Sequence, residues 1–358
     1  MKEKKHGGDI YTYLDKYQKV PLDFSANVNP AGLPKKVKKA LCKSVSKFAP
    51  YPDTECRELR KKIAEYEQVA EENLVFGCGA ADLIFRIVRT LKPRTALLAA
   101  PCFSEYAEAL KSEQCSIGYF YLQEQNNFIL NKDFLSVIAQ PLQIIFICSP
   151  NNPTGQVVEK SIVYEILEKA NSIGCYVVLD ECFMDFVKDK ELYSCTDLLN
   201  KFNNLIILKA FTKNFAMAGL RLGYAMCADQ HLIQLLAECG QPWSVSTPAQ
   251  VAGCAAVDSK EYLSKSLIDN HRERKYLQKE LNKLPVIVFE SKANFILFKL
   301  LVDLNLSLEL YKKGILIRNC ANFPGLKEGF FRVAVKKHRD NRQLIKGLKE
   351  VFEGAEHG

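Results

Sequence analysis

Two basic residues, Lys213 and Arg221, lie close together in the segment KAFTKNFAMAGLRLGYA, which follows the apolar run LIIL. A lysine in a dry pocket or beside other cations has a lowered pKa and becomes a nucleophile that can form a Schiff base with an aldehyde. An arginine can hold a phosphate group through two parallel hydrogen bonds. Taken singly, Lys213 could equally be a surface lysine and Arg221 a partner in a surface salt bridge.

Three further residues suit the parts of an aromatic ring that carries an aldehyde. Asp180 ends the apolar run YVVLD, and a carboxylate there is costly unless it is paired. A protonated ring nitrogen at about 3 Å would attract it by roughly 5 kcal/mol at an effective dielectric near 20. Asn152, in SPNNPTG, could donate to a ring oxygen, and Phe103, in PCFSEY, could stack on the ring face. Alone, Asp180 could instead cap the following helix.

A glycine turn suits a phosphate. In NLVFGCGAADLIFRIV a short strand leads through Gly79, Ala80 and Ala81 into a helix. Such a turn presents free backbone N–H groups and the positive end of the helix to an anion. By itself the pattern is weak, because many turns look like it.

Together these groups describe the binding site of pyridoxal 5′-phosphate. Its aldehyde suits Lys213, its ring nitrogen suits Asp180, its ring oxygen suits Asn152, and its phosphate suits Arg221 and the glycine turn. The sequence therefore predicts this cofactor, with Lys213 and Asp180 as the catalytic residues.

The elements that must position these residues alternate between apolar strands and amphipathic helices. Uninterrupted apolar strands separated by helices are typical of a parallel sheet that is covered on both faces. Ligands of such sheets bind beyond the carboxyl ends of the strands. Expected strands are Ala96–Ala100, Ile144–Cys148, Tyr176–Asp180 and Leu205–Lys209, with a helix at Glu159–Ser172.

The pattern changes near Cys239. A long charged helix is expected at Tyr262–Lys283 and a last helix at Arg339–Phe352, with four short strands between them in VIVFE, NFILFKL, GILIRNC and FFRVAV. We therefore expect an α/β protein with a large, mostly parallel domain at residues 46–238. A smaller α+β domain follows at 239–358, and an N-terminal arm, residues 1–45, packs with it.

Composition narrows the class of protein. The 358 residues carry a formal net charge of +8, but Lys and Arg are spread along the chain, so nucleic acid is not an expected partner. No apolar run is long enough to span a membrane, and the N-terminus lacks the apolar segment of a secretory signal. The 13 cysteines include no C-x-x-C pair, which favours a cytoplasmic protein with reduced thiols and no metal site.

Three motifs, SPNNPTG, LDE and FTKNFAMAGLRLGY, resemble those of the class I/II aminotransferase superfamily of fold-type-I pyridoxal-phosphate enzymes. The similarity runs over nearly the whole chain. It implies that Lys213 carries the cofactor, that Asp180 meets the ring nitrogen and Asn152 the ring oxygen, and that Thr212 and Arg221 join the glycine turn at the phosphate.

The resemblance also implies a homodimer with shared active sites. Tyr51, in YPD, matches a tyrosine that reaches the cofactor of the neighbouring subunit. Arg332, in FRVAV, matches an arginine that receives an anion of the substrate.

One branch of the superfamily is most similar. HGGDIYTYL, LDFSANVNPAGLP, PWSVST and ILIRNCANFPGL resemble segments of threonine-phosphate decarboxylases of cobalamin biosynthesis. These enzymes convert L-threonine O-3-phosphate to (R)-1-aminopropan-2-yl phosphate and CO2. The resemblance implies that His6, Asn27, Asn152, Arg318 and Arg332 bind the phosphate and carboxylate of the substrate.

Three alternatives stay open at this point. One is a histidinol-phosphate-type aminotransferase, and another is a decarboxylase of a related phosphoamino acid such as L-serine O-phosphate. The third is a non-catalytic regulator with an aminotransferase-like domain, against which the complete cofactor motifs argue. The sequence also departs from the superfamily in having Phe183 where a tyrosine is common and Ala210 where a serine or threonine is common.

Overall fold

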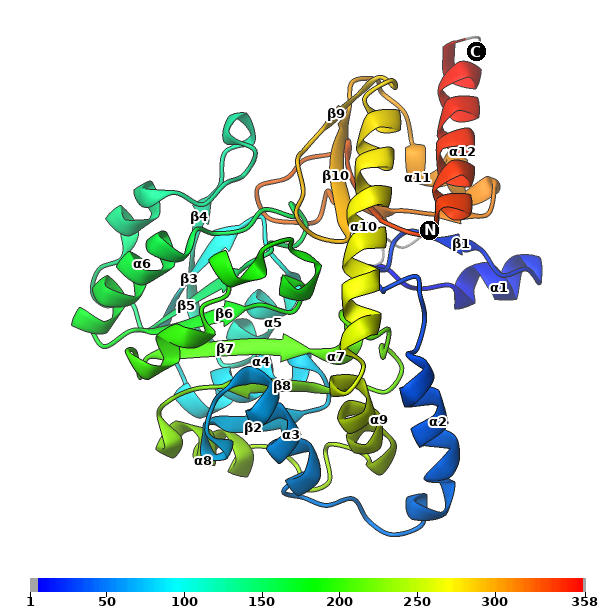
Figure 1. Ribbon diagram of the computed structural model, residues 1–358. Helices are drawn as coiled ribbons and strands as arrows, with labels where there is room; N and C mark the ends of the chain where they lie inside the picture. The colour runs from blue at the N-terminus through cyan, green and yellow to red at the C-terminus, as the bar shows by residue number, and fades with distance from the viewer. Residues whose placement is uncertain (1–5, 357–358) are drawn as a thin grey trace.

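The computed structural model describes residues 6–356 and contains a seven-stranded sheet, a four-stranded sheet and a two-stranded pairing (Figure 1). The large sheet has the strand order β2-β8-β7-β6-β5-β3-β4. Strand β8 is antiparallel to both of its neighbours, and the other pairs in the sheet are parallel. The strands are β2 (Leu74–Gly77), β3 (Thr95–Ala100), β4 (Ser116–Tyr121), β5 (Ile144–Cys148), β6 (Tyr176–Asp180), β7 (Leu205–Ala210) and β8 (Gly223–Met226).

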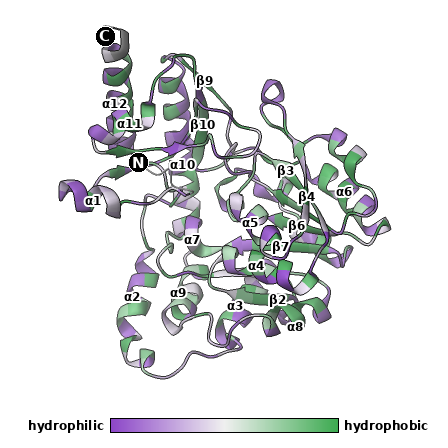
Figure 2. Cartoon of the chain, turned by 180° about the vertical axis from the view of Figure 1, so that it is seen from behind, coloured by the Kyte–Doolittle hydropathy of each residue, from purple (hydrophilic) through white to green (hydrophobic). Residues whose placement is uncertain are grey.

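Helices cover both faces of this sheet, because its inner strands are apolar on both sides. In β6, Val177 and Leu179 pack into one hydrophobic cluster and Val178 packs into the other. Figure 2 shows the apolar strands enclosed by helices that carry both apolar and polar residues. One cluster includes α3 (Arg57–Glu67), α6 (Lys160–Ser172) and α9 (Thr247–Val257), and the other includes α4 (Ala80–Leu91), α5 (Ser104–Ser112) and α8 (Gln230–Glu238).

The four-stranded sheet is antiparallel, in the order β12-β13-β10-β9. Figure 1 shows the long helix α10 running from α9, beside the large sheet, to this smaller sheet. The elements are α10 (Lys260–Leu281), β9 (Val286–Val288), β10 (Phe295–Leu300), α11 (Leu306–Lys312), β12 (Arg318–Asn319), β13 (Phe330–Ala334) and α12 (His338–Glu356).

The N-terminal residues divide between the two parts. Tyr13 of helix α1 (Tyr11–Tyr17) packs edge-to-face against Tyr311 of α11, with ring centroids 5.0 Å apart. Strand β1 (Leu22–Asp23) pairs in parallel with β11 (Ile315–Leu316). Helix α2 (Lys35–Lys43) instead packs on α9. The domain limits at residues 45 and 238 stay predictions.

The expected strands of the large sheet lie within one residue of the observed ones, but one later expectation is wrong. GILIRNC is not a single strand: it forms β11 and β12, which pair with different strands. The chain changes its pairing partner at Ile317. Ile315 and Leu316 pair with β1, whereas Arg318 and Asn319 pair with β13.

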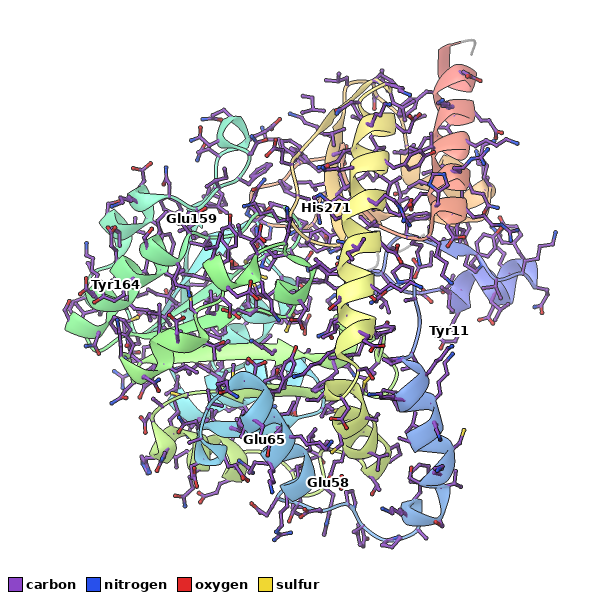
Figure 3. The ribbon with its side chains drawn as sticks, viewed as in Figure 1. Tyr11, Glu58, Glu65, Glu159, Tyr164 and His271 are labelled. Carbon is purple, nitrogen blue, oxygen red and sulfur yellow. The ribbon has the colours of Figure 1, made fainter. Side chains whose placement is uncertain are left out.

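Several acidic side chains lie on the outer surface. Figure 3 shows Glu58, Glu65 and Glu159 directed outward, and all three are exposed. Within residues 6–356, no helix has the length and apolar character needed to cross a membrane.

Candidate functional site

A cavity of about 260 Å³ lies where β5, β6 and β7 end and α4 begins. The arginines of the smaller sheet and the N-terminal segment close its other side. It brings together most of the residues singled out in the sequence: His6, Asn27, Ala80, Ala81, Phe103, Asn152, Asp180, Thr212, Lys213, Arg221, Arg318 and Arg332.

Lys213 lies on the single helical turn α7 (Phe211–Asn214), which follows β7 directly. Burial, followed by the nearby guanidinium groups of Arg332 and Arg221, lowers the pKa of Lys213 to about 8. A larger share of neutral amine is therefore present near neutral pH than for an ordinary lysine. This is the condition that a Schiff-base lysine needs.

Asp180 ends β6, and both of its carboxylate oxygens are held. The Tyr106 hydroxyl donates to Oδ2 at 2.6 Å, and the backbone N–H of Cys182 donates to Oδ1 at 2.9 Å. Burial and the neighbouring Asp180 raise the pKa of Tyr106 well above its ordinary value, so this hydroxyl remains a donor. The carboxylate is thereby fixed in one orientation at the edge of the cavity.

Tyr106 was missed in the sequence. Its signal was its place in PCFSEY, three residues after Phe103, which puts it about one helical turn further along α5. That spacing is also common for a core tyrosine, so only the contact with Asp180 distinguishes it.

The glycine turn and Arg221 form one cradle. Gly79 has φ +84°, and a Cβ at this position would lie 2.6 Å from Arg221 Nη2. Arg221 Nη2 also donates to the carbonyl of Cys78 at 3.4 Å. The guanidinium therefore lies against the turn at the start of α4, where a phosphate would meet both the helix end and the positive charge.

Arg332 is buried at the opposite side of the cavity. Its Nη1 donates to Asn152 Oδ1, and its Nη2 donates to the carbonyl of Ser25 at 2.8 Å. With its amide oxygen facing the guanidinium, Asn27 also accepts from Nη1 at 3.2 Å. Because Oδ1 of Asn152 is occupied by Arg332, its amide nitrogen is left to donate to a ring oxygen.

Arg318 adds a second guanidinium to the same end. It lies on β12 opposite Arg332 of β13, donates to Asn322 Oδ1 at 2.7 Å and stacks over the ring of Phe323 at 5.1 Å. Burial, together with the like charge of Arg318, lowers the pKa of Arg332 to about 10. Two neighbouring guanidinium groups at a cavity wall are suited to a ligand with more than one negative charge.

Tyr51 is not brought into this cavity. Its side chain is 78% exposed, and its ring stacks on Trp243 with centroids 4.4 Å apart. Its expected role toward a neighbouring subunit stays a prediction.

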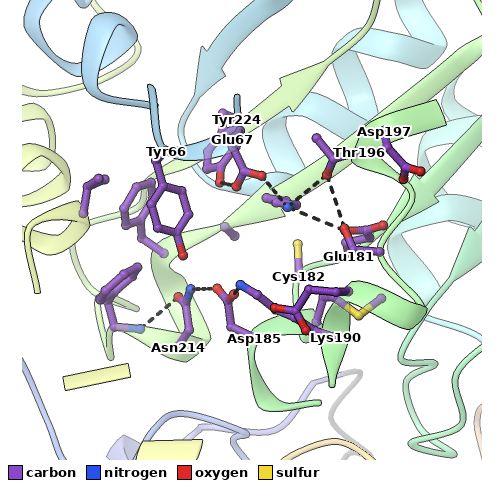
Figure 4. Close-up of a pocket in the computed structure, with 18 of the residues that line it drawn as sticks. Tyr66, Glu67, Glu181, Cys182, Asp185, Lys190, Thr196, Asp197, Asn214 and Tyr224 are labelled. Carbon is purple, nitrogen blue, oxygen red and sulfur yellow. Dashed lines mark hydrogen bonds and ion pairs between the residues drawn. The ribbon is translucent and has the colours of Figure 1, made fainter. Parts of the chain in front are cut away.

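A second cavity, of about 390 Å³, lies beside the first and contains a cluster of paired charges (Figure 4). Lys209 Nζ is 2.6 Å from Glu67 and 3.6 Å from Glu181. Burial alone would lower the pKa of Lys209, but these carboxylates hold it above its ordinary value. The pairing ties the end of β7 to Glu181, the residue after Asp180, and so fixes the strand that carries Asp180 beside the strand that leads into Lys213.

The family model for aminotransferase class I and II matches residues 19–348. The chain belongs to this family. A Caldanaerobacter subterraneus protein, provisionally named as a threonine-phosphate decarboxylase, is 38% identical, with 99% of this chain and 95% of that protein covered. The threonine-phosphate decarboxylase of Salmonella typhimurium is 32% identical, with 98% and 97% covered.

A solved structure has the same fold. The histidinol-phosphate aminotransferase from Clostridium acetobutylicum superposes with a TM-score of 0.87 at 29% identity, covering 92% of this chain and 99% of that one. The expected fold, a mostly parallel sheet with a smaller α+β part, is confirmed.

The functional groups of the site fit pyridoxal 5′-phosphate. Lys213 is a half-buried amine with a lowered pKa, Asp180 is a fixed carboxylate, and the guanidinium of Arg221 lies against the turn at Gly79. Thr212 is buried beside Lys213 and offers a hydroxyl in the same wall of the cavity.

Proposed function

We propose that this protein decarboxylates L-threonine O-3-phosphate with pyridoxal 5′-phosphate, giving (R)-1-aminopropan-2-yl phosphate and CO2 for cobalamin biosynthesis. The pair Arg318 and Arg332 on one wall of the cavity is the observation that supports it most. A phosphoamino acid carries a carboxylate and a phosphate, which two guanidinium groups can hold separately. The names of the relatives at 38% and 32% identity point to the same reaction.

Each residue of the site has its own role in this reaction. The bound cofactor supplies an aromatic ring that accepts the electrons of the bond broken at Cα. Asp180, held by Tyr106, would stabilise a proton on the ring nitrogen of the cofactor, and Lys213 would hold the cofactor through its amine and could return a proton to Cα. Arg221 and the Gly79 turn anchor the phosphate of the cofactor.

The choice between decarboxylation and transamination rests on orientation. The bond that breaks must stand perpendicular to the ring, so the residues that hold the distal phosphate decide which substituent of Cα takes that place. We assign this role to His6, Asn27, Arg318 and Arg332. These residues would place the bond from Cα to the carboxylate perpendicular to the ring.

A histidinol-phosphate-type aminotransferase is the second candidate, because a solved enzyme of that name shares the fold at 29% identity. Incubation with L-threonine O-3-phosphate, with and without a keto acid, separates the two reactions by measuring CO2 and amino-group transfer. We expect CO2 release from the wild type and none from Lys213→Ala. Transfer of the amino group without CO2 would refute the proposal.

The same assay with L-serine O-phosphate tests the substrate. The two substrates differ by one methyl group, which is worth about 1–3 kcal/mol in an apolar pocket. We also propose that the protein is a homodimer with shared sites. We further propose a cytoplasmic location, which is supported by the 13 cysteines, each free in the described structure.

A further inference from the structure

His6 is held at the mouth of the cavity by a carboxylate from a different part of the fold. Its Nε2 lies 3.0 Å from Oε1 of Glu105, which belongs to the first turn of α5. The His6 side chain is 51% exposed and that of Glu105 is 19% exposed. The two residues immediately before Glu105, Phe103 and Ser104, line the cavity together with His6.

The backbone that follows His6 is held by contacts with Ser25. The N–H of Gly8 donates to Ser25 Oγ at 2.7 Å, and a Cβ on Gly7 would lie 2.3 Å from the Ser25 carbonyl oxygen. The carbonyl of Phe24, in turn, accepts from Ala334 of β13 at 2.9 Å. The segment that carries His6 is therefore anchored on the small sheet, whereas Glu105 lies on a helix that covers the large sheet.

The chemistry of imidazole gives this contact a role. In neutral histidine one ring nitrogen donates and the other accepts, whereas the protonated ring donates from both. With Nε2 directed at Glu105, Nδ1 is the nitrogen left for a ligand, and it donates to an anion only when the ring is charged.

We propose that Glu105 is a positioning residue that fixes the orientation of the His6 ring through Nε2, with Nδ1 directed at the distal phosphate of the substrate. This inference rests on the proposed function, because it needs a substrate with such a phosphate. Glu105 does not touch the substrate itself. Its effect is therefore confined to ligands that carry a distal phosphate.

The test compares Glu105→Gln, which keeps the shape of the side chain and removes its charge, with the wild type. The holoenzyme is titrated with L-threonine O-3-phosphate and with L-threonine, and binding is followed by the visible absorption of the bound cofactor. We expect Kd for the phosphorylated ligand to rise about tenfold, which corresponds to ~1.4 kcal/mol. The affinity for L-threonine should stay within about threefold, since the contact of His6 is made to the phosphate alone.

A double-mutant cycle separates positioning from general loss of structure. His6→Ala should lose as much phosphate affinity as Glu105→Gln, and the double variant no more than His6→Ala alone, because both changes remove one contact. Glu108→Gln, on the same helix, is the matched control and should bind both ligands as the wild type does.

Additive losses, or an equal loss for L-threonine, would overturn the assignment of Glu105. Failure of the proposed function looks different. If the wild type releases no CO2 yet binds L-histidinol phosphate, the substrate is wrong, and the same cycle with that ligand still decides the role of Glu105. If no phosphorylated ligand binds more tightly than its unphosphorylated counterpart, both proposals fail.

Discussion

In the protein without its cofactor, a charged Lys213 lowers the free energy of unfolding, because the lysine is desolvated and lies near the positive charges of Arg332 and Arg221. A pKa lowered from 10.5 to about 8 corresponds to roughly 3 kcal/mol of stability. Below pH 8 the lysine is protonated in both the folded and the unfolded state, so the full loss of stability is present. Between pH 8 and 10.5 the folded state has released its proton and the unfolded state has not, so the cost falls as the pH rises.

We therefore predict that Lys213→Met stabilises the cofactor-free protein at pH 7 by roughly 3 kcal/mol and by roughly 2 kcal/mol at pH 9. Urea unfolding of both proteins at the two pH values measures the difference, in which the titration of all other groups cancels. Lys61→Met, at an exposed position of α3, is the control and should show no such pH dependence. A difference that widens with pH would contradict the lowered pKa.

At the scale of elements, the turn between β2 and α4 matters because it fixes the position of Arg221. We predict that Gly79→Ala weakens cofactor binding at least about tenfold, since the new Cβ would lie 2.6 Å from Nη2 and push the guanidinium out of the cradle. The positive φ of +84° adds backbone strain of roughly 1–3 kcal/mol. Titration of the cofactor-free protein with pyridoxal 5′-phosphate, followed by absorption, measures the affinity.

Gly174→Ala is the matched control for strain. Gly174 also has a positive φ, of +69°, but a Cβ there meets nothing within 4 Å. This variant should lose stability and keep the affinity of the wild type for the cofactor. Equal affinities for the two variants would show that Arg221 adapts to the added methyl group.

The elements also show what a sequence can predict. The inner strands could be located because each is a short apolar run buried on both faces, and the polar residues that follow them meet at one edge of the sheet. Strand β8 was missed because it follows the glycine-rich segment after Lys213 and is only four residues long. Strand β4 was missed because it lies at the sheet edge. Its residues are exposed or half-buried, so it lacks the uninterrupted apolar run that marks an inner strand.

Contacts between distant segments could not be predicted in the same way. The contact of Tyr106 with Asp180 joins residues 74 positions apart, and that of His6 with Glu105 joins the N-terminal segment to α5. Each of these side chains has an ordinary place in its own element. Their roles follow only from the packing of one element against another.

At the scale of the whole molecule, several apolar side chains around Tyr51 are exposed. Tyr51 is 78% exposed and Trp243, on which it stacks, is 48% exposed, while Val45 and Phe48 nearby in sequence are also exposed. Clustered exposed apolar side chains are typical of protein interfaces. We therefore infer that this surface meets a second copy of the chain, with Tyr51 directed at the cavity of that copy.

Mixing two inactive variants tests whether the sites are shared. In a symmetric dimer, each site would combine Lys213 of one chain with Tyr51 of the other. We expect Lys213→Ala and Tyr51→Ala homodimers each to have little activity. If chains exchange at random, half of the mixed population pairs the two variants and has one complete site, so activity should recover to about a quarter of the wild type. Refolding the variants together and separately measures this recovery. No recovery in a mixture shown by mass to contain mixed dimers would mean that Tyr51 acts within its own chain or has no part in the site.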